Sequence, residues 1–147
     1  MDLLFDRLLG LDGITILDFE ENDNEIVFKA ASTKKPSCPR CGQNRVNVHD
    51  SYERTIRDLP MKGKKTTIVI DTKQYSCLNE DCPQKVFVPK FDFVDGKNVI
   101  TNRLEKVLAK SSLGYTTFQS VADMYYVDEE TVRRAFKAYT SKVISRT

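Results

Sequence analysis

All four cysteines of the chain fall in two short segments whose spacing is typical of a metal site. Cys38 and Cys41 lie in SCPRCG with two residues between them, and Cys77 and Cys82 lie in SCLNEDCP with four. Structural zinc sites take four soft ligands in a tetrahedron, and pairs of ligands separated by two to four residues are usual. We therefore predict one Zn²⁺ per chain, held by all four thiolates in a zinc ribbon.

Three other uses of the thiols compete with zinc. Disulfides are disfavoured in a reducing compartment, and we expect a cytoplasmic chain because the first 20 residues lack the basic segment of a signal peptide. A rubredoxin-like iron site stays open, since sequence separates iron from zinc poorly. A redox CxxC lacks the surrounding βαβ pattern. His49, the only histidine, lies in the middle of a predicted strand and is not expected to be a ligand.

The charge of the chain is unevenly distributed. Residues 1–30 contain two basic and eight acidic residues, a net charge of −6, whereas the remainder contains 21 basic and 13 acidic residues, a net of +8. The basic part is a candidate for binding a polyanion. Basic residues also flank the cysteines, where they either offset the negative charge of a four-thiolate zinc site or contact phosphate: Lys34, Lys35, Arg40, Arg45 and Lys85.

The elements that must position the cysteines are predicted to be strands. A short helix over residues 2–9 precedes strands at 14–16 and 25–28, which flank a turn at 22–24, and a basic linker covers 32–36. A strand begins at Arg45, a turn spans Pro60–Lys65, and strands follow at 68–75 and 86–88. Each cysteine pair then lies at a strand end, and the hairpin between them brings the two pairs together.

After Gly96 the apolar period changes from strand-like to helix-like. We predict one helix capped by Thr101 and two more over 117–125 and 128–144. Residues 118–137 have the pattern of a helix-turn-helix, although Tyr126 occupies the turn position where glycine is usual. Its expected core consists of Val121, Ala122, Val132 and Ala135.

Asp128 is expected to cap the last helix, which would enter the DNA major groove. The candidate DNA contacts on that helix are Glu130, Thr131, Arg133, Arg134 and Lys137. A basic stripe on the first of the three helices is formed by Arg103, Lys106 and Lys110, and the ribbon adds Arg40 and Arg45.

The predicted fold class is therefore α+β, with three parts. Residues 1–35 form an acidic helix and β-hairpin head, residues 36–95 form a four-cysteine zinc ribbon, and residues 96–147 form a helix-turn-helix bundle. No apolar run approaches the ~20 residues of a membrane helix, so no membrane partner is expected.

Three segments in order resemble a known family. CPRCG, VHDSYERTIRDLP and YSCLNEDCPQKVF, followed by the helix-turn-helix, are similar to the N-terminal part of bacterial insertion-sequence transposases of the ISL-three group, over roughly residues 36–140. The resemblance implies that Cys38, Cys41, Cys77 and Cys82 are the zinc ligands and that residues 117–139 bind element-end DNA. In this family, strand transfer takes place in a later RNase H-like domain with three acidic residues.

The sequence ends at Thr147, before such a domain could begin. We therefore expect a non-enzymatic DNA-binding module for transposition, either cut from a longer parent chain with a catalytic domain or free-standing. Double-stranded DNA is the expected partner, and a homodimer is a further option. The alternatives are a stand-alone zinc-ribbon and helix-turn-helix regulator, and an adaptor whose zinc is structural and whose acidic head binds a protein.

Overall fold

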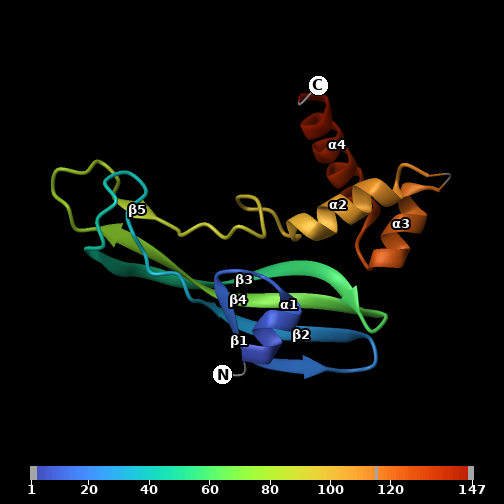
Figure 1. Cartoon of the computed structure of the whole chain (residues 1–147), viewed down its shortest axis with the longest axis horizontal. Coiled ribbons are helices and arrows are strands. Elements are labelled where there is room, and N and C mark those ends of the chain that lie inside the picture. Colours follow the sequence, from blue (N-terminus) through green and yellow to red (C-terminus); the bar gives the residue numbers. More distant parts are fainter. Residues whose placement is uncertain (1–2, 115, 146–147) are drawn as a thin grey trace. The chain divides into compact units, whose positions relative to one another are not determined.

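The computed structural model describes residues 3–114 and 116–145 as a mixed α+β protein, which confirms the predicted class (Figure 1). The helices are α1 (Leu3–Leu9), α2 (Asn102–Ser111), α3 (Phe118–Tyr125) and α4 (Glu129–Ser145). The strands are β1 (Ile14–Glu21), β2 (Glu25–Ser32), β3 (Val46–Met61), β4 (Lys64–Cys77) and β5 (Val86–Phe87). Among the helices described, none has both the length and the apolarity needed to cross a membrane.

The five strands form one sheet. Its order is β1-β2-β4-β3, and β5 pairs antiparallel with β4, with Tyr75 opposite Phe87 and Ser76 opposite Val86. The hairpin of the acidic head therefore shares a sheet with the strands that connect the two cysteine pairs. This pairing has a physical reason, because a single two-stranded hairpin is marginally stable in water and gains from further strands.

The hairpin between β3 and β4 is tighter than expected. The predicted turn over Pro60–Lys65 is wrong in extent, since only Lys62 and Gly63 lie outside the strands. Both have positive φ, 55° and 70°, as in a two-residue loop whose twist matches that of the strands. Pro60 is tolerated inside β3 because β3 ends the sheet order, and a proline costs no ladder bond on an open edge. The first two strands also extend beyond the predicted 14–16 and 25–28.

The chain divides into two compact units, each built from several segments. The first unit contains the chain up to Phe19 together with Phe28–Thr55 and Ile68–Asp92, and the second contains Glu20–Val27, Ile56–Thr67 and the chain from Phe93 onward. All four cysteines belong to the first unit and helices α2–α4 to the second. The boundaries at residues 35 and 95 stay a prediction.

In the first unit, α1 is fastened to β1 by one carboxylate. Thr15 Oγ1 donates to Asp6 Oδ2 at 2.9 Å, and the Ile16 amide donates to Asp6 Oδ1 at 2.8 Å. Besides Cys38, the buried apolar side chains described in this unit are Leu9, Leu11, Ile14, Ile16, Phe28, Ala30, Ile68, Ile70, Phe87 and Phe91. An acidic residue of the head thus has a structural role, which net charge alone did not indicate.

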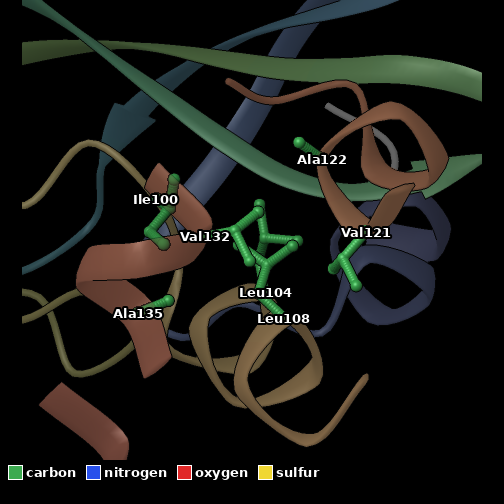
Figure 2. Close-up of a cluster of buried hydrophobic side chains, with 7 residues drawn as sticks. All are labelled: Ile100, Leu104, Leu108, Val121, Ala122, Val132 and Ala135. Atoms are coloured by element: carbon green, nitrogen blue, oxygen red, sulfur yellow. The ribbon is translucent and has the colours of Figure 1, made fainter. Parts of the chain in front are cut away.

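In the second unit, α2, α3 and α4 enclose a small apolar core (Figure 2). Its members are Ile100, Leu104, Leu108, Val121, Ala122, Val132 and Ala135. The four core residues predicted from α3 and α4 are among them. The predicted caps are also confirmed, since Thr101 accepts from the Leu104 amide at 3.3 Å and Asp128 accepts from the Thr131 amide at 2.7 Å.

Tyr126 ends α3 in the left-handed conformation, with φ 60° and ψ 39°. A non-glycine residue pays about 1 kcal/mol or more in this region of φ/ψ space. Two hydrogen bonds within the second unit hold it there. Its carbonyl accepts from Arg57 Nη1 at 2.7 Å, and its hydroxyl donates to the Gly63 carbonyl at 2.5 Å. The tyrosine therefore replaces the usual glycine because it fastens the turn before α4 to β3 and to the hairpin loop.

A buried carboxylate connects β3 to the start of α2. Asp58 is fully buried, and its Oδ1 accepts from Thr101 Oγ1 at 2.7 Å and from Arg103 Nε at 2.9 Å. Arg103 Nη2 also pairs with Asp58 Oδ2. Burial of an ionised carboxylate is costly unless charged donors surround it, so this pair stabilises the junction mainly by avoiding an unpaired charge.

We expect Arg103→Ala to destabilise the protein by about 3 kcal/mol, because it leaves Asp58 buried with one neutral donor. Urea unfolding of zinc-loaded protein measures this loss. Lys106→Ala is the matched control, since Lys106 is exposed on the same helix and such surface changes stay within about 0.5 kcal/mol. Equal unfolding midpoints for the two variants would show that Arg103 has no structural role.

Candidate metal centre

The four cysteine sulfurs form one cluster in the first unit. All four Sγ atoms lie within 4.8 Å of one another. The Cys38–Cys82 and Cys41–Cys77 sulfur pairs are each separated by 3.7 Å. A tetrahedral ion with bonds of roughly 2.3 Å to sulfur has sulfur–sulfur edges of about 3.8 Å, whereas a disulfide bond is about 2.05 Å long. The geometry fits one four-coordinate ion, and all four cysteines are free thiols.

The first cysteine turn closes in the way its glycine predicts. Gly42 has φ 72°, its amide donates to the Cys38 carbonyl at 2.9 Å, and the Cys38 amide donates to the Gln43 carbonyl at 3.0 Å. Positive φ costs glycine little, so the chain reverses around the sulfurs without strain. Cys38 is the buried ligand of the pair, and Cys41 is exposed.

The second turn has no glycine, and Asn79 organises it instead. Its side chain accepts from the Asp81 amide and its carbonyl accepts from the Cys82 amide, both at 3.1 Å. The Gln43 amide and the Asn79 side chain both donate to the Cys41 sulfur and lower the pKa of that thiol. Asn79 therefore contacts a ligand from the other turn. Asparagine commonly forms such turns, so its position between the two cysteines is the sequence signal from which this role could have been predicted.

Backbone amides point at the sulfurs. Hydrogen bonds from the amides of Cys41 and Arg40 lower the pKa of Cys38, and the Gln43 amide lowers the pKa of Cys41 to about 6. The other two thiols also accept from amides, of Asn79 for Cys77 and of Gln84 for Cys82, but burial and the neighbouring sulfurs outweigh these bonds. The pKa of Cys77 is thereby raised to about 12. Four adjacent thiols cannot all ionise by themselves, so a metal ion must displace their protons.

One backbone hydrogen bond connects the two cysteine turns, and a second closes the turn between Cys77 and Cys82. The Leu78 amide donates to the Arg45 carbonyl at 3.0 Å, and the Cys77 amide donates to the Lys85 carbonyl at 3.2 Å. Arg45 and Lys85 contribute backbone carbonyls to these bonds, and both residues are exposed. His49 is exposed on β3 and is not part of the metal-binding group found in the described residues.

The predicted DNA contacts on α4 are engaged with their neighbours. Arg133 Nη2 pairs with Glu129 Oε1 at 2.6 Å, and its guanidinium lies 5.2 Å from the centre of the Phe118 ring. Arg134 Nε lies 3.4 Å from Glu130 Oε1. Both arginines are exposed, and each has an acidic partner on the same helix. These pairs form because acid and base stand four residues apart on one helix face.

The remaining candidates differ in exposure and partner. Thr131 donates through both its amide and its hydroxyl to Asp128 Oδ1, at 2.7 and 2.6 Å, so it belongs to the helix cap. Arg103 is held by Asp58, and its phosphate contact stays a prediction. Of these remaining candidates, Lys106, Lys110 and Lys137 are exposed in the second unit, and Arg40 and Arg45 are exposed in the first. The candidates thus divide between the two units.

Comparison with known proteins identifies one segment of the chain. Residues 34–82 match the family described as the zinc-finger of transposase IS204/IS1001/IS1096/IS1165. No curated protein and no solved structure matches the chain. The matched segment contains all four clustered cysteines, so residues 34–82 are similar to a transposase zinc finger, and the cluster fits one Zn²⁺ as its cofactor.

We expect the purified protein to contain one zinc per chain and Cys82→Ser to lose it, because three thiolates hold the ion far less tightly than four. Elemental analysis measures the number of zinc ions per chain, and a zinc indicator checks it after a thiol-reactive reagent has released the ion. Leu78→Ala is a control inside the same turn that removes no ligand. A full complement of zinc in Cys82→Ser, or iron in the wild-type protein, would contradict the assignment.

Proposed function

We propose that this chain is the DNA-binding module of a transposase-like protein and that α3 and α4 form a helix-turn-helix whose second helix reads element-end DNA. Its direct partner is double-stranded DNA. The catalytic domain of such a transposase belongs to a longer parent chain, and pairing of two copies would match the two ends of an element.

The observation that carries this proposal is the way α3 meets α4. The two helices are joined by three residues, 126–128, and they share one core to which α3 contributes Val121 and Ala122 and α4 contributes Val132 and Ala135. The α2 helix completes that core through Leu104 and Leu108 (Figure 2). A short turn, a small residue at the crossing and a third supporting helix are typical of DNA-binding helix pairs.

The chemistry of the exposed face of α4 also supports the proposal. Arg133, Arg134 and Lys137 all lie outside that core. An arginine can bind guanine O6 and N7 bidentately, worth about 1–3 kcal/mol of discrimination between bases. The pairs with Glu129 and Glu130 compete only weakly, since an exposed ion pair four residues apart is worth about 0.3–0.5 kcal/mol. The Phe118 ring restricts Arg133 further and reduces the entropy it loses on binding.

The zinc module contributes in a different manner. Arg40 and Arg45 lie close to the zinc cluster in sequence and are exposed. Long-range attraction and phosphate contacts require only positive charge, so these residues add affinity without sequence preference. The family to which residues 34–82 match supports a function in transposition.

We expect Arg133→Ala and Arg134→Ala to reduce the preference for an element-end duplex over a random duplex by about tenfold, the loss of one bidentate base contact. Fluorescence anisotropy on the two duplexes measures this ratio. Lys106→Ala is the matched control, because a phosphate contact is lost equally on both duplexes and lowers the salt slope by about one unit. If both arginine variants keep full discrimination between the two duplexes, α4 does not read the sequence, and the zinc ribbon becomes the candidate reader.

We expect the chain by itself neither to cut nor to join DNA strands. A two-metal nuclease site needs carboxylates that converge on ions about 4 Å apart, whereas acids of the second unit are committed to lysines, arginines and a helix cap. Incubation of an end-labelled element-end duplex with the protein and Mg²⁺ or Mn²⁺ should return intact strands. Specific nicks that disappear in a carboxylate variant would contradict this expectation.

A further inference from the structure

The end of the β3–β4 hairpin carries lysines whose ammonium groups lie close to acids of the β1–β2 hairpin. Lys62 Nζ and Lys64 Nζ both lie 2.8 Å from the same oxygen, Glu21 Oε2. Lys65 Nζ lies 3.5 Å from Glu25 Oε2. All these residues belong to the second unit, which also contains α4. The arrangement is therefore a property of one compact unit.

Two ammonium groups around one oxygen form an anion site. Each ammonium repels the other, and only an anion between them makes the arrangement favourable. The two lysines lower the pKa of Glu21 from 4.5 to about 2, so its carboxylate is ionised at neutral pH and fills the site with negative charge. A non-bridging phosphate oxygen has the same charge and accepts the same hydrogen bonds.

The site lies next to the turn that precedes α4. Tyr126 donates to the carbonyl of Gly63, which stands between Lys62 and Lys64 in the sequence. The Tyr126 carbonyl is in turn held by Arg57 of β3. Because Tyr126 is three residues before the first residue of α4, a duplex that receives the start of α4 in its groove passes close to this loop. The neighbouring groups of such a duplex are backbone phosphates.

The local charge explains why this loop is not an obvious DNA contact. The β1–β2 hairpin end contains four acids, Glu20, Glu21, Asp23 and Glu25, against three lysines at the end of the β3–β4 hairpin, Lys62, Lys64 and Lys65. The lysines are thus neutralised in the free protein. A pair of this kind at the surface contributes little to stability, and Lys62, whose side chain is 67% exposed, is accessible to a second anion.

We propose that Lys62 and Lys64 form a phosphate-binding site of the DNA interface and that Glu21 occupies this site when DNA is absent. The inference rests on the proposed function, since the phosphate is that of the duplex read by α4. On binding, a backbone phosphate replaces the Glu21 carboxylate between the two ammonium groups. Glu21 therefore lowers the affinity for DNA, and its removal strengthens binding.

The test measures affinity for a random-sequence duplex as a function of salt. Glu21→Gln keeps the shape of the side chain but removes its charge, and we expect binding to tighten by about fivefold, with a salt slope steeper by about one unit. Asp23→Asn is the matched control, because it removes the same charge from the same hairpin and Asp23 has no lysine partner among the described residues. It should have a much smaller effect.

A second background separates the site from general electrostatics. In the Lys62→Ala/Lys64→Ala variant, Glu21→Gln should give no gain over Asp23→Asn. The proposal is overturned if Glu21→Gln and Asp23→Asn act alike, or if the gain persists without the two lysines. If either of these results is found while Arg133→Ala still loses discrimination between duplexes, the phosphate site is refuted and the proposed function is kept. If no variant binds duplex DNA, the proposed function is refuted as well.

Discussion

Four thiolates within 4.8 Å of one another are stable only around a cation, and the cysteine-bearing segment of the first unit depends on that constraint. From residue 33 to residue 55, Cys38 is the one buried residue. Apolar burial therefore contributes little to holding this segment. The zinc ion replaces a hydrophobic core in this segment, as it does in other small modules. The free energy of metal binding is therefore also free energy of folding for this segment.

The second unit is held by different forces. Its three helices bury an apolar cluster, and its strands are joined to them by charged and polar contacts: Asp58 to Arg103 at the start of α2, and Arg57 to Tyr126 at the turn before α4. These contacts are directional, so they fix the position and orientation of α4 within the second unit. The proposed reading function of α4 would depend on that rigidity, because each bidentate base contact is worth about 1–3 kcal/mol of discrimination.

Much of this could be predicted from local sequence patterns. Cysteine spacing gave the metal ligands, threonine and aspartate before apolar runs gave the helix caps, and a 3.6-residue period gave the core of α3 and α4. Each of these signals acts over a few residues, where steric and hydrogen-bonding preferences are strong.

The features that were missed depend on contacts between distant residues. The pairing of β2 with β4 involves a loop closure that no local pattern encodes. Arg103 was read as a surface base because its partner, Asp58, is 45 residues away, and the partner of Lys62, Glu21, is 41 residues away. Sequence patterns predict which residues are charged, but only the fold determines whether a charge meets another residue or solvent.

The most direct test of the central claim is a two-dimensional amide NMR titration of the zinc-loaded protein with an element-end duplex. The account predicts shifts along the exposed side of α4, around Arg133 and Lys137, and at the loop formed by Lys62 and Gly63, while the apolar core of the helices keeps its signals. Shifts restricted to residues 34–82, with α4 unchanged, would contradict the assignment of DNA reading to this helix.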